Sequence, residues 1–195
     1  MEERQINEKE SLELISQMIR NTQQRFQKGN AAPFLVFGYL TVILSLVIWY
    51  MLEITHNAYW NMLWLFIPVL GTFGLKLIFP NRKKNVRTVV DKAVDYVWLV
   101  IGFCMLLAGL TTFYVYFPIF FEEVLLMGIA VTLTGLITKL KILTFPGILT
   151  MLSAVLFTLG IVQGIDQILL FGAIFFVFMV LPGHILYAKK DIGNV

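Results

Sequence analysis

Two adjacent carboxylates, Glu122 and Glu123, stand inside the long apolar stretch FPIFFEEVLL at residues 117–126. An ionised side chain in hydrocarbon is costly, so such a pair either belongs to a proton or cation pathway or marks a helix end that reaches water. Pro118 stands just before the pair, and proline near a helix start with acids in the first turn complements the helix dipole. The sequence leaves both interpretations open.

Two more acids, Glu53 and Asp166, stand at the ends of other apolar stretches. We predict that these ends lie on the same side of a membrane as the carboxylate pair. The four acids then form a candidate outer acidic mouth, made of Glu53, Glu122, Glu123 and Asp166. An outer surface that carries no lysine would also show several acids by chance, so the set predicts a cation site only as one of two interpretations.

A second candidate site is the segment VLPGHILYAKK near the C-terminus. Pro182 removes a backbone hydrogen bond, Gly183 loosens the helix, and His184 stands where polar aromatic side chains meet the membrane surface. Pro182, Gly183 and His184 therefore predict either a bent helix end with interfacial anchors, or an inner hinge with a titrating histidine.

Enzyme chemistry finds little support in the residue types. Adjacent glutamates resemble those of the membrane metalloproteases that process prenylated proteins, but Met127 stands where those enzymes carry arginine. The two histidines, His56 and His184, are predicted on opposite membrane faces and cannot share a metal. A single cysteine, Cys104, excludes an intrachain disulfide and a cysteine metal cluster. We therefore predict no catalytic residues, no cofactor and no metal ligands.

The composition explains where these residues sit. The chain has 195 residues, is 58% hydrophobic and only 14% charged, and its mean hydropathy is +0.81. Soluble domains carry roughly a quarter charged residues, and apolar runs of about 20 residues span a bilayer as helices. The sequence predicts an all-α, polytopic membrane protein with six spans joined as three antiparallel hairpins. The spans lie at about 33–53, 59–79, 96–116, 119–138, 142–162 and 167–187.

The basic residues orient this bundle. With the N-terminus inside, all 15 lysines and arginines fall on the inner side, as the positive-inside rule requires. We predict the bacterial inner (plasma) membrane, with both termini cytoplasmic. The pI near 9.0 then reflects attraction to anionic inner-leaflet lipids, and no motif for nucleic acid accompanies it.

The polar leader, residues 1–31, is predicted as a separate cytoplasmic unit before the bundle at 32–188 and a cytoplasmic tail at 189–195. Apolar residues recur in it at helical intervals and predict an amphipathic helix over 7–28. Gly29 and Asn30 are expected to end that helix and turn the chain into the first span. The candidate partner-binding face consists of Leu12, Ile15, Ile19 and Phe26.

Two further patterns bear on packing. The third helix is expected to begin near Thr88, before it enters hydrocarbon. Small residues recur on one face of the fourth and fifth spans, and close packing through such residues holds helices together in lipid. They are Gly128, Thr132 and Gly135 in the fourth span, and Gly147, Thr150, Ala154 and Thr158 in the fifth.

The leader ESLELISQMIRNTQQRF, the six short spans and the terminal LPGHILYAKK resemble a family of small uncharacterised bacterial inner-membrane proteins. The resemblance covers most of the chain and implies a six-span fold, and it carries over no functional residue. The leading prediction is a non-enzymatic membrane protein whose cytoplasmic layer binds a protein partner or a second copy, in a regulatory, scaffold or accessory role. The alternatives are a small transporter or channel for apolar or lipid-like molecules and, third, an intramembrane enzyme.

Overall fold

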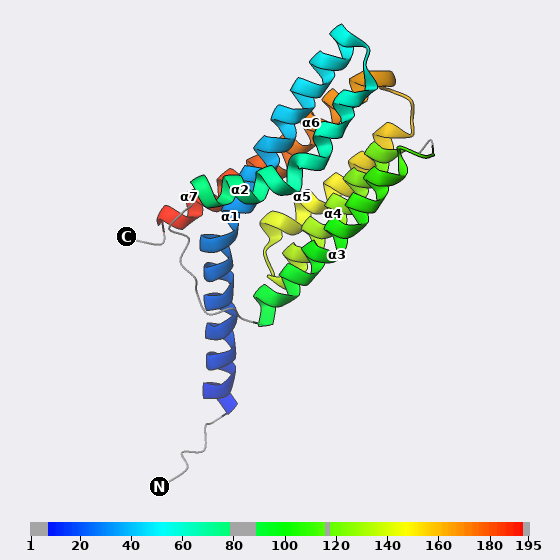
Figure 1. Ribbon diagram of the computed structural model, residues 1–195. Coiled ribbons are helices and arrows are strands. Elements are labelled where there is room, and N and C mark those ends of the chain that lie inside the picture. The colour runs from blue at the N-terminus through cyan, green and yellow to red at the C-terminus, as the bar shows by residue number, and fades with distance from the viewer. Residues whose placement is uncertain (1–7, 79–88, 116–117, 193–195) are drawn as a thin grey trace.

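A computed structural model describes the backbone of residues 8–78, 89–115 and 118–192, and side chains at 12, 13, 16, 17, 31–78, 89–115 and 118–188. The described chain is all-helical, as predicted (Figure 1). Its elements are α1 (Glu8–Thr55), the 3-10 helix η1 (Ala58–Phe66), α2 (Ile67–Ile78), α3 (Val89–Thr111), α4 (Ile119–Ile137), α5 (Lys141–Ala154), the 3-10 turns η2 (Val155–Phe157) and η3 (Gly164–Asp166), α6 (Gln167–Phe175), the π-helix η4 (Phe176–Val180) and α7 (Leu181–Ile192).

These helices form two layers. One contains α1, η1–α2 and the long C-terminal helix α6–η4–α7, and the other contains α3, α4 and α5 (Figure 1). Helices that are joined by a short link do not always pack against each other. Helix α5 packs most extensively on α4, whereas α6 and α7 pack on α1. The predicted third hairpin therefore has its two helices in different layers.

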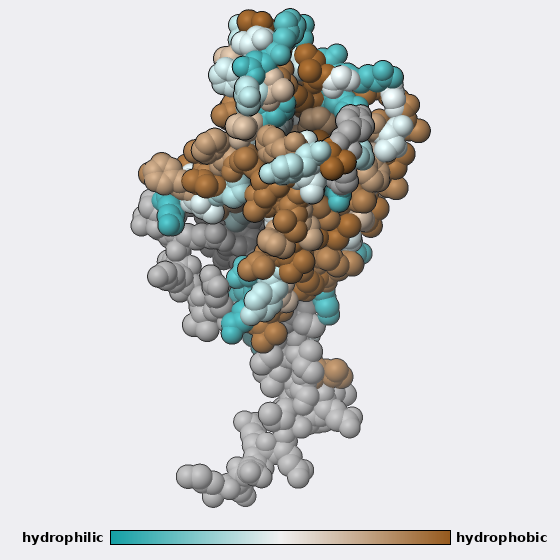
Figure 2. Space-filling model, turned by 45° about the vertical axis from the view of Figure 1, so that its right-hand side comes forward, coloured by the Kyte–Doolittle hydropathy of each residue, from teal (hydrophilic) through white to brown (hydrophobic). Residues whose placement is uncertain are grey.

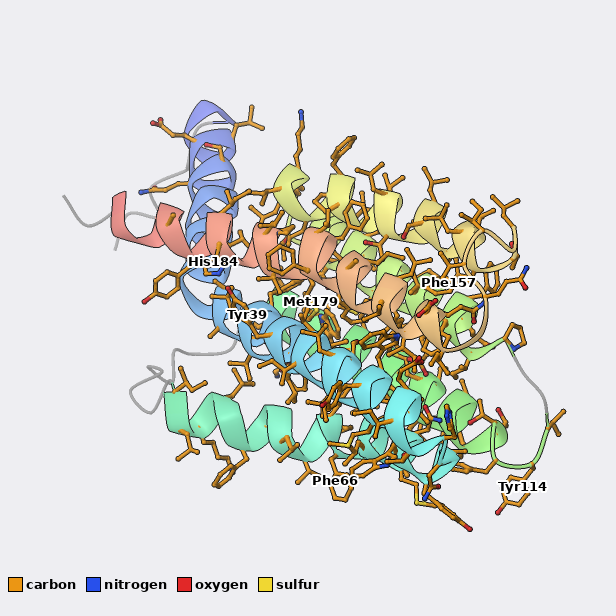
Figure 3. All side chains as sticks on the ribbon, turned by 90° about the horizontal axis from the view of Figure 1, so that it is seen from above. Tyr39, Phe66, Tyr114, Phe157, Met179 and His184 are labelled. Carbon is orange, nitrogen blue, oxygen red and sulfur yellow. The ribbon has the colours of Figure 1, made fainter. Side chains whose placement is uncertain are left out.

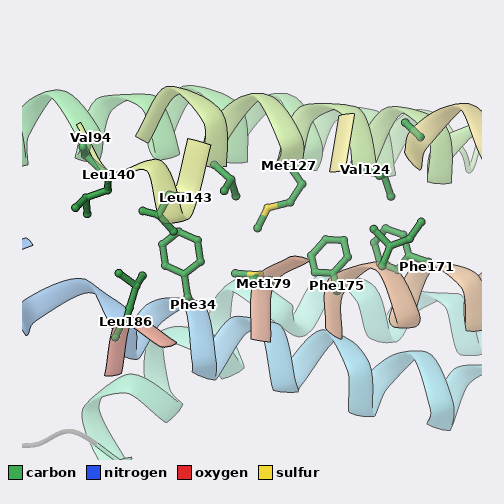
Figure 4. Close-up of a cluster of buried hydrophobic side chains, with 14 of the residues drawn as sticks. Phe34, Val94, Val124, Met127, Leu140, Leu143, Phe171, Phe175, Met179 and Leu186 are labelled. Atoms are coloured by element: carbon green, nitrogen blue, oxygen red, sulfur yellow. The ribbon is translucent and has the colours of Figure 1, made fainter. Parts of the chain in front are cut away.

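The main hydrophobic core lies between the layers (Figure 4). Phe34 of α1 and Phe175 and Met179 of the C-terminal helix face Met127 and Leu143 of the other layer. The Phe34 ring meets the Trp98 indole edge-on, with ring centroids 5.9 Å apart. Interlocking aromatic and branched side chains therefore join the two layers.

The predicted spans are confirmed in part, and their number, six, stays a prediction. Five helical segments are long and apolar enough to cross a membrane, and Lys141–Phe157 is a shorter apolar helix, at the lower end of the lengths that span a bilayer. The five are Ala31–Thr55, Ala58–Ile78, Val89–Thr111, Ile119–Ile137 and Gly164–Ala188. The predicted start of the third helix near Thr88 lies outside the described residues, which resume within α3 at Val89.

The outer surface of the bundle is apolar. Brown hydrophobic residues cover most of its middle in Figure 2, and teal hydrophilic residues gather towards its ends. Helices α2 and α3 expose whole rows of large side chains, among them Val69, Phe73 and Leu77 on α2 and Leu99 and Phe103 on α3. Apolar surface on this scale is what hydrocarbon covers, so the helices indicate a membrane protein.

The predicted helix end at Gly29 and Asn30 is wrong. Helix α1 runs through both residues and continues to Thr55 as one helix of 48 residues. Glycine and asparagine stop a helix where one of them takes the left-handed conformation, and here the strong helix formers Ala31 and Ala32 follow instead. Pro33 inside the helix bends it, as prolines do, and α1 changes direction where its dark-blue part leaves the bundle (Figure 1).

A single stretch of the C-terminal helix departs from α geometry. Proline cannot donate the hydrogen bond that an α-helix requires and clashes with the preceding turn. Just before Pro182 the chain widens into the π-helix η4, where the Leu181 N–H donates to the carbonyl of Phe176, five residues earlier. The helix then continues as α7 to Ile192, so Pro182 and Gly183 do not end it.

The α4–α5 pair is packed through glycines. A Cβ added at Gly135 would overlap the backbone nitrogen of Thr144, and one at Gly147 would overlap Thr132. At Gly128 it would stand 2.6 Å from the Met151 nitrogen. The predicted small-residue faces meet at these glycines. A tight turn joins the helices: Lys139 takes a φ of 56°, and the Leu140 N–H donates to the Gly135 carbonyl at 2.8 Å, which is a Schellman-type end.

Candidate functional site

The described residues with the most distinctive polar contacts lie along one seam. There α1 runs beside the C-terminal helix in the opposite direction (Figure 3). The Trp49 indole N–H donates to Asp166 Oδ1 at 2.9 Å near one end of the seam. Near the other end, a Cβ added at Gly183 would lie 3.1 Å from Leu35 Cδ2. The two helices are thus held in register over about 14 residues of α1, or about 21 Å.

A tyrosine–histidine pair bridges the seam near the start of α7. Tyr39 Oη and His184 Nε2 are 2.7 Å apart, and the rings meet edge-on with centroids 5.7 Å apart. Both residues are exposed on the outside of the bundle, and Figure 3 shows the two side chains together. The pair joins α1 to α7 just beyond the π-helix and presents polar atoms on an otherwise apolar surface.

An apolar groove of about 240 Å³ opens on the same seam. Its floor is made by Ser45, which is 1% exposed, and by Gly172, where a Cβ would stand 2.8 Å from Ser45 Cβ. The Ser45 hydroxyl donates to the Thr41 carbonyl at 2.8 Å, so the floor offers no unsatisfied polar atom. The groove is lined by Val42, Ser45, Leu46, Leu169, Gly172, Ala173 and Phe176.

The structure divides the predicted inner site in two. Pro182 and Gly183 are buried, with Gly183 beside Leu35 of α1, whereas His184 is exposed and hydrogen-bonded to Tyr39. Tyr39 was not predicted as a site residue, because a lone tyrosine in a span does not reveal a partner 145 residues away. The one feature of the sequence that could have indicated Tyr39 is its hydroxyl group, which is polar and stands within an apolar stretch.

The predicted acids gather at the opposite end of the bundle. Glu122 lies in the first turn of α4, which begins after Pro118, and Glu123 follows it. Both are half-buried, whereas Glu53 and Asp166 are exposed. Phe120, two residues before Glu122, packs on the Phe157 and Phe171 rings, which brings this helix start against η2 and α6. Among the described residues, no three His, Cys, Asp or Glu side chains are placed to hold a metal ion.

The predicted partner-binding face lies on the first part of α1. The backbone is helical from Glu8, and Leu12 is 67% exposed. The amphipathic character of this segment stays a prediction. The side chains of Ile15, Ile19 and Phe26 lie outside those that the structure describes. Residues 8–30, called the arm from here on, extend away from the bundle in Figure 1.

Between the layers, the interior is closely packed. A space of about 10 Å³ is lined by Met127, Val131, Thr150, Ile174, Phe175, Phe178 and Met179, which is about the room that one water needs. The polar groups nearby are satisfied locally: the Trp98 indole N–H donates to Thr134 Oγ1 at 3.1 Å, and the Thr134 hydroxyl donates to the Ala130 carbonyl at 2.7 Å.

Comparison with known proteins adds no relative. No protein-family model, no curated protein and no solved structure matches the chain.

Proposed function

We propose that this chain is a non-enzymatic integral membrane protein whose arm pairs with the arm of a second copy, in a regulatory, scaffold or accessory role. The observation that carries the proposal is the continuity of α1. Its 48 residues correspond to about 72 Å of helix, more than twice the roughly 30 Å of a hydrocarbon core. The arm accounts for about 35 Å of this length and is joined to the first span without a break.

The spacing of apolar residues on the arm favours a second copy as the occupant. Leu12, Ile15, Ile19 and Phe26 follow steps of three, four and seven residues, which are the a and d positions of a coiled coil, with Thr22 at the remaining d position. Two copies in one membrane present their arms side by side and in the same direction. Two and a half heptads are short for a free coiled coil, but tethering to a membrane raises the effective concentration.

We further propose a six-span arrangement in the bacterial inner membrane, with both termini in the cytoplasm. The charge distribution supports it, because all 15 basic residues then lie inside. It places the arm, the α2–α3 link and the tail in one cytoplasmic layer. The resemblance to small six-span inner-membrane proteins is part of this proposal.

Cysteine labelling in sealed cells tests the topology. In a Cys104→Ala background, Asn57→Cys and Gln167→Cys should react with a membrane-impermeant maleimide from outside. Asn85→Cys and Asn194→Cys should react only after the membrane is opened. Labelling of position 85 from outside would overturn the six-span arrangement.

Crosslinking in vesicles tests the pairing of arms. In the same background, Ile19→Cys at an a position should form an intermolecular disulfide at least about tenfold more than Gln17→Cys, which lies at an f position and faces away. Ile19→Glu should abolish dimers detected by single-molecule photobleaching, whereas Gln17→Glu adds the same charge and should leave them intact. Equal crosslinking at positions 17 and 19 would refute pairing through this face.

The transporter or channel alternative draws less support from the geometry. Transport of a polar substrate needs a hydrated passage, and the interior space lined by α4, α5 and the C-terminal helix is about 10 Å³. The feature that favours the alternative is the groove between α1 and α6, which suits an apolar or lipid-like molecule. The enzyme alternative has no cluster of catalytic groups among the described residues to support it.

A further inference from the structure

We propose that the seam between α1 and the C-terminal helix is a binding site for one phospholipid of the surrounding bilayer. One acyl chain occupies the groove between α1 and α6, and the phosphate oxygens accept hydrogen bonds from the Tyr39–His184 pair. This site is separate from the arm and does not depend on the arm's function.

The groove has the chemistry of an acyl-chain site. Its walls are Val42 and Leu46 on one side and Ala173 and Phe176 on the other, and its volume is about 240 Å³. The Ser45 hydroxyl at the floor donates its proton to the Thr41 carbonyl, so the floor offers no free hydrogen-bond donor. A hydrocarbon chain in such a groove contacts protein on three sides, which gives it more dispersion contacts than a chain lying on a convex helix surface.

The polar pair stands at the end of this groove. On α1, Tyr39 is three residues before Val42, which puts it on the same face about one turn away. On the partner helix, His184 lies eight residues after Phe176 and four residues before Ala188, where the span ends. The pair is therefore near the headgroup level, where polar aromatic tips normally lie.

The hydrogen-bond geometry leaves donors for a headgroup. When the Tyr39 hydroxyl donates to His184 Nε2, the neutral ring carries its own proton on Nδ1. The exposed ring can offer that N–H to a phosphate oxygen. An amphiphile with a phosphate head and an apolar tail matches this order of groups, whereas a plain hydrocarbon matches only the groove.

Photocrosslinking with two probes tests the site. The full chain is reconstituted in phosphatidylglycerol–phosphatidylcholine vesicles that contain either a phosphatidylglycerol with a mid-chain diazirine or a diazirine-bearing alkane without a headgroup. Labelled peptides are located by mass spectrometry. The phospholipid probe should concentrate on residues 39–50 and 169–177, whereas the alkane should label the exposed rows of α2 and α3 as strongly as the seam.

Three variants sharpen the result. Ala173→Phe fills the mouth of the groove from an exposed position and should lower phospholipid labelling of the seam about tenfold, equivalent to about 1.4 kcal/mol. Cys104→Phe adds the same ring at an exposed position of α3 and should leave seam labelling unchanged. Tyr39→Phe keeps the ring and the groove, and should lower labelling by the phospholipid but not by the alkane.

The opposite results overturn the proposal. These are equal distributions of the two probes, seam labelling that survives Ala173→Phe, and protein–protein crosslinks at Leu46→Cys that show a second copy seated in the groove. Because Ile19→Glu acts on the arm alone, loss of dimers in that variant leaves the phospholipid result untouched, so the two proposals fail separately.

Discussion

The α4–α5 pair and the η1–α2 segment are both apolar, yet they are held in opposite ways. In the most apolar stretch of α4, 44% of the residues are buried, compared with 6% in the stretch from Ala58 to Ile78. The first pair lets backbones approach through Gly128, Gly135 and Gly147, whereas on α2 Gly71 lies against the Phe37 side chain of α1. In lipid, apolar character alone does not drive helices together, so small residues decide which helices become the centre of a bundle.

The largest expected difference between the two regions comes from side-chain truncation. Leu143 of α5 is fully buried, so Leu143→Ala should lower the free energy of unfolding by about 2–5 kcal/mol through lost contacts and a cavity. Phe73 of α2 is 60% exposed, and Phe73→Ala should cost less than about 1 kcal/mol. Equilibrium unfolding in mixed micelles measures both. Comparable losses would mean that α2 packs against protein, such as a second copy.

Glycine replacements sharpen the comparison in the opposite direction. Gly135→Ala should destabilise the protein by about 1–3 kcal/mol, because the new methyl meets the backbone of Thr144, which cannot move aside. Gly102 of α3 has nothing within 4 Å of the added methyl, so Gly102→Ala should stabilise by up to about 1 kcal/mol through helix propensity. The same unfolding assay measures both variants. A change of the same sign in the free energy of unfolding of Gly135→Ala and Gly102→Ala would contradict the packing described for α4 and α5.

A smaller effect is expected at the tryptophans. Trp98→Phe keeps the aromatic contact with Phe34 but removes the hydrogen bond to Thr134, and should cost about 0.5–1.5 kcal/mol. Trp64 of η1 packs edge-on against Phe171, and its indole N–H has no hydrogen-bond partner among the described residues. Trp64→Phe should therefore cost less than Trp98→Phe. A larger loss at Trp64 would show that η1 is held more firmly than its exposure suggests.

The smallest effect is expected at the turn between α4 and α5. Lys139 holds a left-handed conformation that glycine adopts without strain. Lys139→Gly should raise stability by about 0.5 kcal/mol, the relief of strain being partly offset by entropy gained in the unfolded chain. Lys141→Gly, at the first residue of α5, lacks that relief and should lower stability. Thermal melts of the two variants, compared in the same detergent, check the sign.

The sequence predicted the apolar helices, but neither the continuity of α1 through Gly29 and Asn30 nor which helices pack together. Span boundaries follow from hydropathy because each apolar run must satisfy its own backbone in lipid. The glycines of α4 and α5 were found because their spacing is local. Contacts between Tyr39 and His184 or Trp49 and Asp166 join residues more than 100 positions apart, and no periodicity encodes such a pair. The assignment of each helix to one of the two layers was missed for the same reason. A short link shows which helices are connected, but not which of their faces pack together.

The π-helix before Pro182 sets the rotational phase of everything that follows it. Each residue of an α-helix advances the side-chain direction by about 100°, and η4 accommodates one residue more than α geometry would. If residues 176–180 took α geometry without losing a residue, the remaining segment would swing by about that angle. His184 would leave Tyr39, and Gly183 would no longer lie against Leu35. A single inserted residue thus acts as an angular offset that keeps both halves of one helix aimed at the same neighbour.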